Sequence, residues 1–271
     1  MAEKKILIVG LSDAGKSTYL GALNGALRQE GDFCLKYGGK SSNEEYLNKI
    51  TEKWLGGEKI EHTSDGEPQY IKWHLKNQDD VAIDIIIPDM KGEMYEGIIN
   101  NDFDGNLNEY CKDVCGILLF VNNIQKPVLK EDANKTMSQP VEASKETSAD
   151  QIKLTPGNMT DVTKNILVVK YLKELIGDVR IVVAVSSWDM LTTFDSIQEY
   201  CEKQIAGLYN YVRRNFKHYR FCGVSAQGFA IGSYPKNLDE LTSTGKRAYI
   251  FETEKDYDIS KPLRYLIEDL S

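Results

Sequence analysis

The sequence is poor in the residues that build metal and disulfide sites. Its three histidines, at positions 62, 74 and 218, lie far apart and without the spacing of metal ligands. Five cysteines are scattered through the chain, and no His or Cys pair stands near Cys111 and Cys115 to complete a zinc site. The sequence therefore gives no sign of zinc, and its cysteines are expected to be reduced and structural, as in a cytosol.

Long apolar runs and a leader segment are also missing. After Met1 the chain reads Ala-Glu-Lys-Lys and enters a strand pattern, with no apolar stretch of signal-peptide length. The longest apolar runs, residues 116–121 and 181–185, are far shorter than the roughly 20 residues of a membrane-spanning helix. A net charge of −8 disfavours broad electrostatic binding to nucleic acid or anionic membrane. We therefore expect a cytoplasmic protein with no nucleic-acid partner and no integral membrane segment.

What the sequence does contain is an alternation of apolar runs and helical patterns. This alternation predicts one α/β domain over residues 1–271, with a mostly parallel six-stranded sheet and helices on both faces. The strands are expected at residues 5–9, 70–75, 81–87, 115–121, 180–185 and 220–224. The helices are expected at residues 16–27, 43–55, 162–176, 195–211 and 259–270.

Two stretches interrupt the alternation. Residues 28–69, which contain the amphipathic pattern at 43–55, are far longer than a plain connection between a helix and a strand. Residues 125–161 contain three prolines and no aromatic residue, and they are rich in Lys, Glu, Ser and Thr. This composition predicts a flexible insertion and not a second domain.

The segment from Gly10 to Ser17 matches the pattern Gly, four residues, Gly, Lys, then Ser or Thr. Glycines let the backbone turn its N–H groups around a phosphate, and the helix that follows presents its positive end. Lys16 is expected to reach the β- and γ-phosphates and the Ser17 hydroxyl to bind Mg²⁺. Because the segment joins a buried strand to a helix, we predict a phosphate loop. Its nucleotide-binding residues are Ser12, Asp13, Ala14, Gly15, Lys16, Ser17 and Thr18.

Three further motifs follow predicted strands, in an order that resembles that of G proteins. Asp89-Met90-Lys91-Gly92 resembles their Asp-x-x-Gly motif, in which the acid holds Mg²⁺ and the glycine amide senses the γ-phosphate. Asp189 ends a segment that stands where G proteins carry Asn-Lys-x-Asp, and its carboxylate can accept from two N–H groups of guanine that adenine lacks. The third motif, Ser225-Ala226-Gln227, resembles the Ser-Ala-Lys motif, whose backbone amide meets the guanine oxygen. The predicted base-binding residues are Ser187, Trp188, Asp189, Ser225, Ala226 and Gln227.

The chain thus resembles the TRAFAC class of P-loop GTPases, with a G-domain-like fold, and within it the bacterial double-GTPase group. The narrower resemblance lies in Lys53-Trp54-Leu55-Gly56, ahead of Thr63, and in the C-terminal segment from Ser260 to Leu266. It implies GTP and GDP as ligands, Mg²⁺ as the metal, and residues 28–69 as an extended switch I. Thr63 is expected to be the switch threonine that binds Mg²⁺, with Thr51 as the alternative.

The chain departs from the G-protein pattern in ways that affect its chemistry. Ser187 replaces the lysine that packs on the base, with Trp188 as a possible substitute surface, and Ser186 replaces the asparagine that braces the phosphate loop. Glu93 stands where small G proteins place the glutamine that orients water. A carboxylate there would repel the γ-phosphate, so we expect slow intrinsic turnover. The catalytic set is Lys16, Thr63, Gly92 and Glu93.

The phosphate loop carries no arginine, so we expect an effector or an activating partner, or a second copy of the chain in a homodimer, to supply one. Two alternatives to a GTPase switch stay open from the sequence. One is a nucleotide-gated scaffold that hydrolyses little GTP. The other is an ATPase, which the altered base motif leaves possible.

Overall fold

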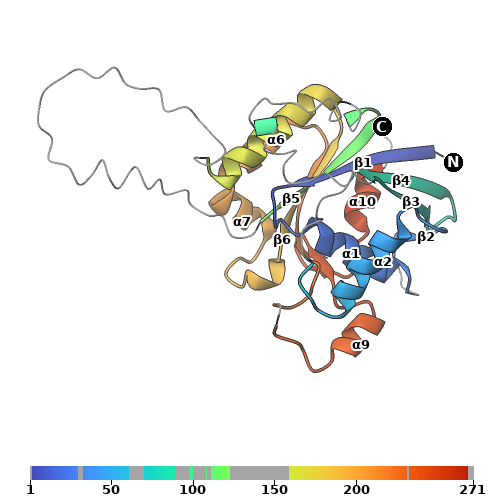
Figure 1. Ribbon diagram of the computed structural model, residues 1–271. Coiled ribbons are helices and arrows are strands. Elements are labelled where there is room, and N and C mark those ends of the chain that lie inside the picture. The colour runs from blue at the N-terminus through green and yellow to red at the C-terminus, as the bar shows by residue number, and fades with distance from the viewer. Residues whose placement is uncertain are drawn as a thin grey trace, which may run out of the picture.

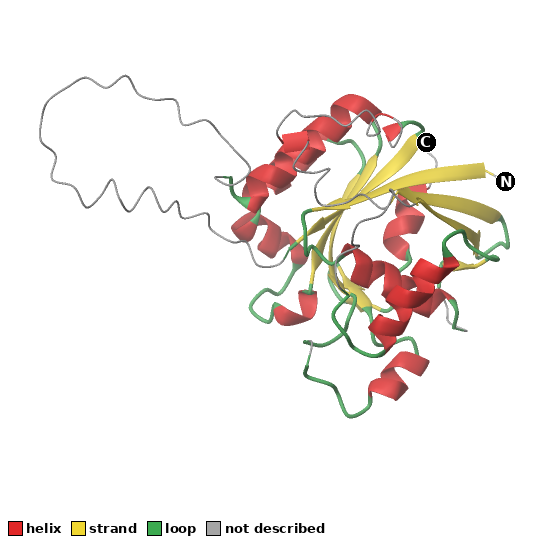
Figure 2. Cartoon of the chain, viewed as in Figure 1, coloured by secondary structure: helices red, strands yellow, loops and turns green. Residues whose placement is uncertain are grey.

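A mixed β-sheet forms the centre of the fold in the computed structural model, which describes residues 2–29, 33–60, 70–88, 98–99, 108, 111–122, 159–230 and 232–267 (Figures 1 and 2). Within these residues the sheet has nine strands in the order β2-β3-β4-β1-β5-β6-β7-β8-β9. The strands are β1 (Ala2–Gly10), β2 (Leu35–Tyr37), β3 (Tyr70–Asn77), β4 (Ala82–Pro88), β5 (Val114–Val121), β6 (Arg180–Ser186), β7 (Tyr219–Ser225), β8 (Tyr249–Phe251) and β9 (Lys255–Asp256).

The middle of the sheet is parallel and its two margins are antiparallel. Strands β4, β1, β5, β6 and β7 pair in parallel, so their carboxyl ends share one edge of the sheet. Strands β2 and β3 extend one margin in antiparallel pairing, and β8 and β9 extend the other. All six predicted strands are present. The prediction of a six-stranded sheet was nevertheless wrong, because β2, β8 and β9 span only two or three residues and carry no readable alternation.

Helices cover both faces of the sheet, as the sequence predicts. The alternation along β1 divides the core, because Ile6 and Ile8 pack on one face while Leu7 and Val9 pack on the other. The first face carries α1 (Lys16–Leu27), α2 (Glu44–Leu55) and α10 (Lys261–Ile267). The second carries α6 (Asp161–Ile176), α7 (Ile197–Gln204) and α8 (Ala206–Asn215). The short elements η2 (Trp188–Met190) and α9 (Leu238–Ser243) follow β6 and β7.

The structure corrects two predicted boundaries. The helix expected at residues 195–211 is two helices, α7 and α8, because Ile205 leaves the helical region with φ of −128° while its side chain stays fully buried. Residues 159–161, the end of the stretch predicted to be an insertion, belong to the fold, since Met159 is buried and Thr160 caps α6 by accepting from the amide of Thr163. Residues 123–158 lie outside the described part of the chain.

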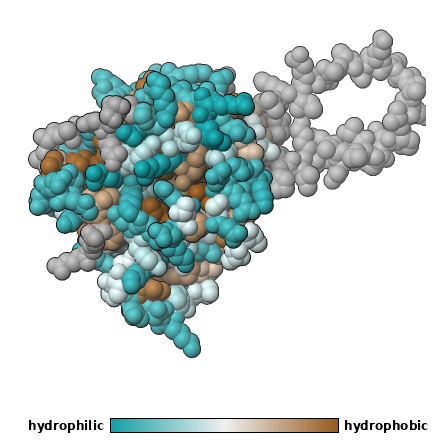
Figure 3. All heavy atoms as spheres, turned by 180° about the vertical axis from the view of Figure 1, so that it is seen from behind, coloured by the Kyte–Doolittle hydropathy of each residue, from teal (hydrophilic) through white to brown (hydrophobic). Residues whose placement is uncertain are grey.

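The surface seen from behind is largely hydrophilic, with hydrophobic side chains in scattered spots (Figure 3). Among the described residues, no helix has the length and apolar character needed to cross a membrane.

Helices α1 and α2 approach each other closely, and glycines in α1 make this possible. A Cβ on Gly21 would lie 2.8 Å from the carbonyl oxygen of Ile50, and one on Gly25 would lie 2.7 Å from the ring of Trp54. Between the two glycines, Asn24 Nδ2 donates to Thr51 Oγ1 over 2.8 Å in a buried bond. Helix α2 is therefore fixed against the helix that follows the phosphate loop.

We expect Gly21→Ala to destabilise the protein by about 1–3 kcal/mol, because the added methyl meets backbone and cannot be accommodated by a rotamer change. This loss would exceed the gain of about 1 kcal/mol that alanine normally brings to a helix. Urea unfolding monitored by circular dichroism measures it. Gly207→Ala in α8 is the matched control, since its Cβ would lie 3.4 Å from Ile166, an ordinary contact. Equal stability of the two variants would contradict the close packing.

Candidate functional site

The phosphate loop lies between the end of β1 and the start of α1. Its backbone turns through left-handed conformations at Asp13, with φ of 60°, and at Gly15, with φ of 87°. At its start, a Cβ on Gly10 would lie 2.5 Å from the carbonyl oxygen of Phe120 on β5. Lys16 Nζ donates to the carbonyl oxygens of Gly10 at 2.7 Å and Leu11 at 3.0 Å. The loop therefore curls around the ammonium group of its own lysine.

The first turn of α1 is suited to an anion. Within α1, whose residues are all described, the first turn carries no acidic residue and its N-cap, Gly15, offers no side-chain acceptor to the helix amides. The positive end of the helix dipole at this turn favours a negatively charged group. Ser17 and Thr18 lie in this turn and are partly buried. The geometry fits the phosphate-binding role expected for residues 12–18.

The phosphate loop packs against the end of β6. A Cβ on Gly15 would lie 3.1 Å from the Cβ of Ser186, the last residue of that strand. Ser186 Oγ donates to the carbonyl oxygen of Val121 over 3.2 Å, so this serine braces the end of β5. At the position where G proteins carry the asparagine, the backbone of Gly15 thus packs directly on the short side chain of Ser186.

The base-motif residues are joined to each other by side-chain hydrogen bonds. Asp189, in η2 just beyond β6, accepts from the hydroxyl of Ser225 at 2.6 Å, and Ser225 is fully buried at the end of β7. The Ser225 oxygen in turn accepts from the amide of Gly228 at 3.2 Å. The structure thus brings together, at one edge of the sheet, the phosphate loop, Asp189 and the Ser225-Ala226-Gln227 loop.

Tyr249 on β8 lies near this pair and was missed by sequence reasoning. Burial and the nearby negative charge of Asp189 raise the pKa of its phenol, while a hydrogen bond with Ser225 works in the opposite direction. The phenol is therefore neutral at physiological pH and can act as a hydrogen-bond partner beside Asp189. A tyrosine at the start of a three-residue strand carries no motif that could have indicated this position.

The model of the Double-GTPase 1 family matches residues 7–266, which is nearly the whole chain. This chain belongs to the Double-GTPase 1 family. No curated protein matches it. Among solved structures, Methanosarcina barkeri Roco2 RocCORdC bound to GDP is similar, with 14% identity and a TM-score of 0.37 over 98% of this chain and 52% of that one. The chain spans about half the length of that structure, and so distant a likeness carries no inference about its chemistry.

In this Double-GTPase 1 member, the ring of Trp188 is packed in the core. Its side chain is 5% exposed, stacks on Phe251 at 5.3 Å between ring centres and meets Tyr200 edge-on. Gly223 leaves room for it, since a Cβ there would lie 2.3 Å from the indole. The expectation that Trp188 could substitute for the base-packing lysine therefore finds no support in the position of its ring. Ser187, which precedes it, is exposed and has a φ of 50°.

Two residues outside the predicted set hold the Ser225-Ala226-Gln227 loop. Trp54 Nε1 donates to the carbonyl oxygen of Ala226 at 2.8 Å, and Arg247 Nε donates to that of Gln227 at 3.2 Å. The Gln227 side-chain amide is buried and has no hydrogen-bond partner among the described residues. Arg247 follows a helix of six residues and precedes β8, so no sequence pattern marks it.

Four predicted site residues, Thr63, Asp89, Gly92 and Glu93, lie outside the described part of the chain. Of the expected Mg²⁺ ligands the structure thus places Ser17, whose hydroxyl in the first turn of α1 fits a ligand of a hard cation. Groups of three or more His, Cys, Asp or Glu side chains able to hold a metal are absent from the described residues. Asp89 follows β4 directly in the sequence, and β4 pairs in parallel with β1.

We expect Trp188→Phe to lower stability by about 1–3 kcal/mol, because the smaller ring leaves space in the core. Nucleotide affinity should stay within about twofold, since the indole packs away from the loop surface. Urea unfolding and titration with a fluorescent guanine nucleotide measure the two effects. A loss of binding free energy larger than the loss in the free energy of unfolding would instead indicate that the indole contacts the base.

Proposed function

We propose that the chain binds GTP and GDP with Mg²⁺ and hydrolyses GTP to GDP and phosphate, as a cytoplasmic molecular switch with slow intrinsic turnover. The observation that carries the proposal is the meeting of the phosphate loop and the Asp189–Ser225 pair through the contact of Gly15 with Ser186. Ligands of open α/β sheets bind at the carboxyl ends of the strands, where both lie. Membership of the Double-GTPase 1 family supports the same assignment.

The roles of the residues follow from the chemistry of phosphoryl transfer, in which positioning and charge stabilisation dominate. Lys16 would move from the loop carbonyls to the β- and γ-phosphates, and the amides of the loop would surround the β-phosphate. Mg²⁺, held by Ser17, Thr63 and Asp89, would neutralise charge that develops on the phosphates. Asp189 would accept from two N–H groups of guanine, and the Ala226 amide would donate to the guanine oxygen. Gly92 would contact the γ-phosphate and Glu93 would orient water.

We expect wild-type protein to bind GTP and GDP more tightly than ATP in calorimetry with Mg²⁺. Lys16→Ala should weaken the binding of guanine nucleotides by about 10–100-fold, because it removes a charge-assisted contact to the phosphates. Asp189→Asn should lose the preference for guanine and gain affinity for xanthosine nucleotides, whose carbonyl can accept from the new amide. Equal binding of ATP and GTP by wild type would contradict the guanine assignment, and no binding would leave a scaffold role.

Single-turnover hydrolysis should be slow, below about 10⁻² s⁻¹ without a partner, because the phosphate loop supplies no arginine. Chelation of Mg²⁺ with EDTA should abolish it, and Lys16→Ala provides the background rate. Acceleration by a partner protein or by raised protein concentration would indicate an effector or a homodimer that completes the site. Tight GTP binding with no turnover above the Lys16→Ala background would favour the alternative, a nucleotide-gated scaffold.

A further inference from the structure

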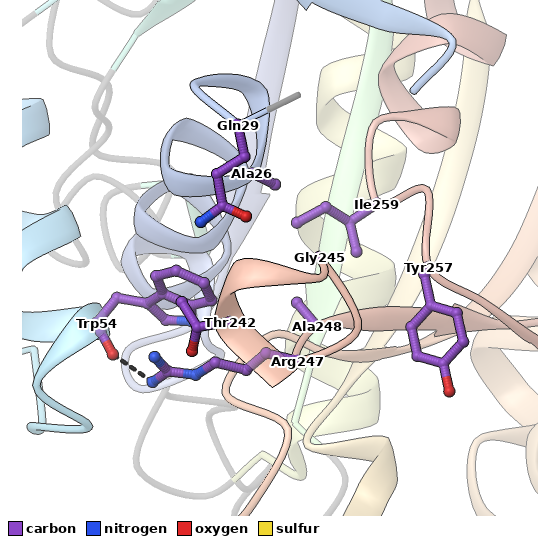
Figure 4. Close-up of a pocket in the computed structure, with 9 residues that line it drawn as sticks. All are labelled: Ala26, Gln29, Trp54, Thr242, Gly245, Arg247, Ala248, Tyr257 and Ile259. Atoms are coloured by element: carbon purple, nitrogen blue, oxygen red, sulfur yellow. Dashed lines mark hydrogen bonds between the residues drawn. The ribbon is translucent and has the colours of Figure 1, made fainter. Parts of the chain in front are cut away.

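A buried arginine, Arg247, joins the base loop to helix α2. Its side chain is part of the core, with 2% exposure, and its donors reach two separate segments. Nε donates to the carbonyl oxygen of Gln227 at 3.2 Å, while the two terminal nitrogens donate to the carbonyl oxygens of Leu55, at 3.2 Å, and Trp54. Figure 4 shows the guanidinium group lying against Trp54, with the bond to its carbonyl.

The surroundings of Arg247 explain how a buried cation is tolerated. Its guanidinium lies 4.0 Å from the ring centre of Trp54 and 5.1 Å from that of Phe229, so it makes cation–π contacts with two aromatic rings. The two α2 carbonyls lie at the helix C-terminus, where the dipole favours positive charge. No carboxylate among the described residues forms an ion pair with it, and burial lowers its pKa to about 10. It therefore remains charged at neutral pH.

Arg247 also contacts the base loop through its backbone. Gly228, with φ of 82°, lies so close that a Cβ there would be 2.1 Å from the carbonyl oxygen of Arg247. The carbonyl of Ala226, one residue before Gln227, accepts a hydrogen bond from the indole N–H of Trp54. Two consecutive peptide carbonyls of the loop are thus fixed by one cation–aromatic pair. None of the side-chain hydrogen bonds of Arg247 goes to the phosphate loop.

The pocket beside this contact is a separate feature. Its lining includes Gln29, Trp54, Arg247 and Tyr257, and no residue of the phosphate loop lines it (Figure 4). The pocket is therefore separate from the phosphate loop, and Arg247 contacts the Ser225-Ala226-Gln227 loop through the carbonyl of Gln227.

We propose that Arg247 is a positioning residue for base recognition, which holds the Ser225-Ala226-Gln227 loop in register with helix α2 and thereby sets selectivity for guanine. The proposal rests on the proposed function, since it assumes that the Ala226 amide meets the guanine oxygen. An apolar residue at position 247 would leave the Gln227 and Leu55 carbonyls without their donor, and the loop would lose its fixed orientation. The phosphate contacts, which belong to residues 10–18, would stay in place.

The test compares the ratio of GDP to ADP affinity in wild type, Arg247→Met, Arg247→Lys and a control. Arg247→Met should weaken the binding of GDP by about tenfold and that of ADP by no more than about twofold, because only the contact with the base depends on the loop. Arg247→Lys should fold more stably than Arg247→Met, yet lower the ratio as well, because one ammonium group cannot span both segments. Arg220→Met is the matched control, since Arg220 also stacks on an aromatic ring, Tyr265, at 4.3 Å.

A second variant keeps the proposal testable should Arg247→Met fail to fold. Trp54→Phe retains an aromatic face for the guanidinium but removes the donor to Ala226, so it should also lower the GDP-to-ADP ratio. In wild type, amide hydrogen exchange over residues 44–60 should slow more with GDP than with ADP, and this difference should vanish in both variants.

The outcomes separate the proposal from the function on which it rests. A wild type that binds GDP and ADP equally would refute the proposed function. A wild type that prefers GDP, with variants that lose stability but keep the same ratio, would overturn the role of Arg247 alone. A parallel loss of GDP and ADP affinity would likewise overturn it, because the effect would then belong to the whole site and not to the base.

Discussion

The contact between Gly15 and Ser186 holds the two halves of the site together, and most of the remaining geometry depends on it. Gly15 turns the chain into α1 with φ of 87°, a conformation that side chains disfavour, and an added Cβ would also lie in tight contact, 3.1 Å from the Cβ of Ser186. The residues proposed to bind phosphate follow one strand, and those proposed to bind the base follow two others. Packing the backbone of Gly15 on the short side chain of Ser186 fixes the distance between them more tightly than a long, flexible side chain would.

The sequence predicts the elements whose apolar residues recur at the spacing of the face that the structure buries. Helix α1 was predicted at its observed bounds, and the six longer strands were found, because each is a run of apolar residues with one or two buried faces. The phosphate loop follows from its spacing, since few other segments place two glycines and a lysine between a strand and a helix. Asp189 and Ser225 were predicted as parts of separate motifs, and the structure joins them in one hydrogen bond.

The parts that sequence could not predict depend on partners distant along the chain. Strand β2 begins where the amide of Cys34 donates to Asp258 and that of Leu35 to Ser260, over more than 220 positions of separation. Arg247 illustrates the same limit at the site. Its hydrogen-bond partners are backbone carbonyls, which every residue possesses, so no complementary side chain elsewhere in the sequence could indicate where it binds.

Helix α2 has consequences for how residues 28–69 can respond to a nucleotide. On one side it packs on Gly21 and Gly25 of α1 and bonds through Thr51, and on the other it is held by Arg247. Moving α2 away would expose its apolar face and break its hydrogen bonds with Asn24 and Arg247, at about 0.5–1.5 kcal/mol net for each bond. A nucleotide contact worth a few kcal/mol cannot offset that sum. The helix therefore stays in place within the domain, and a nucleotide would alter the protection of its amides without displacing it.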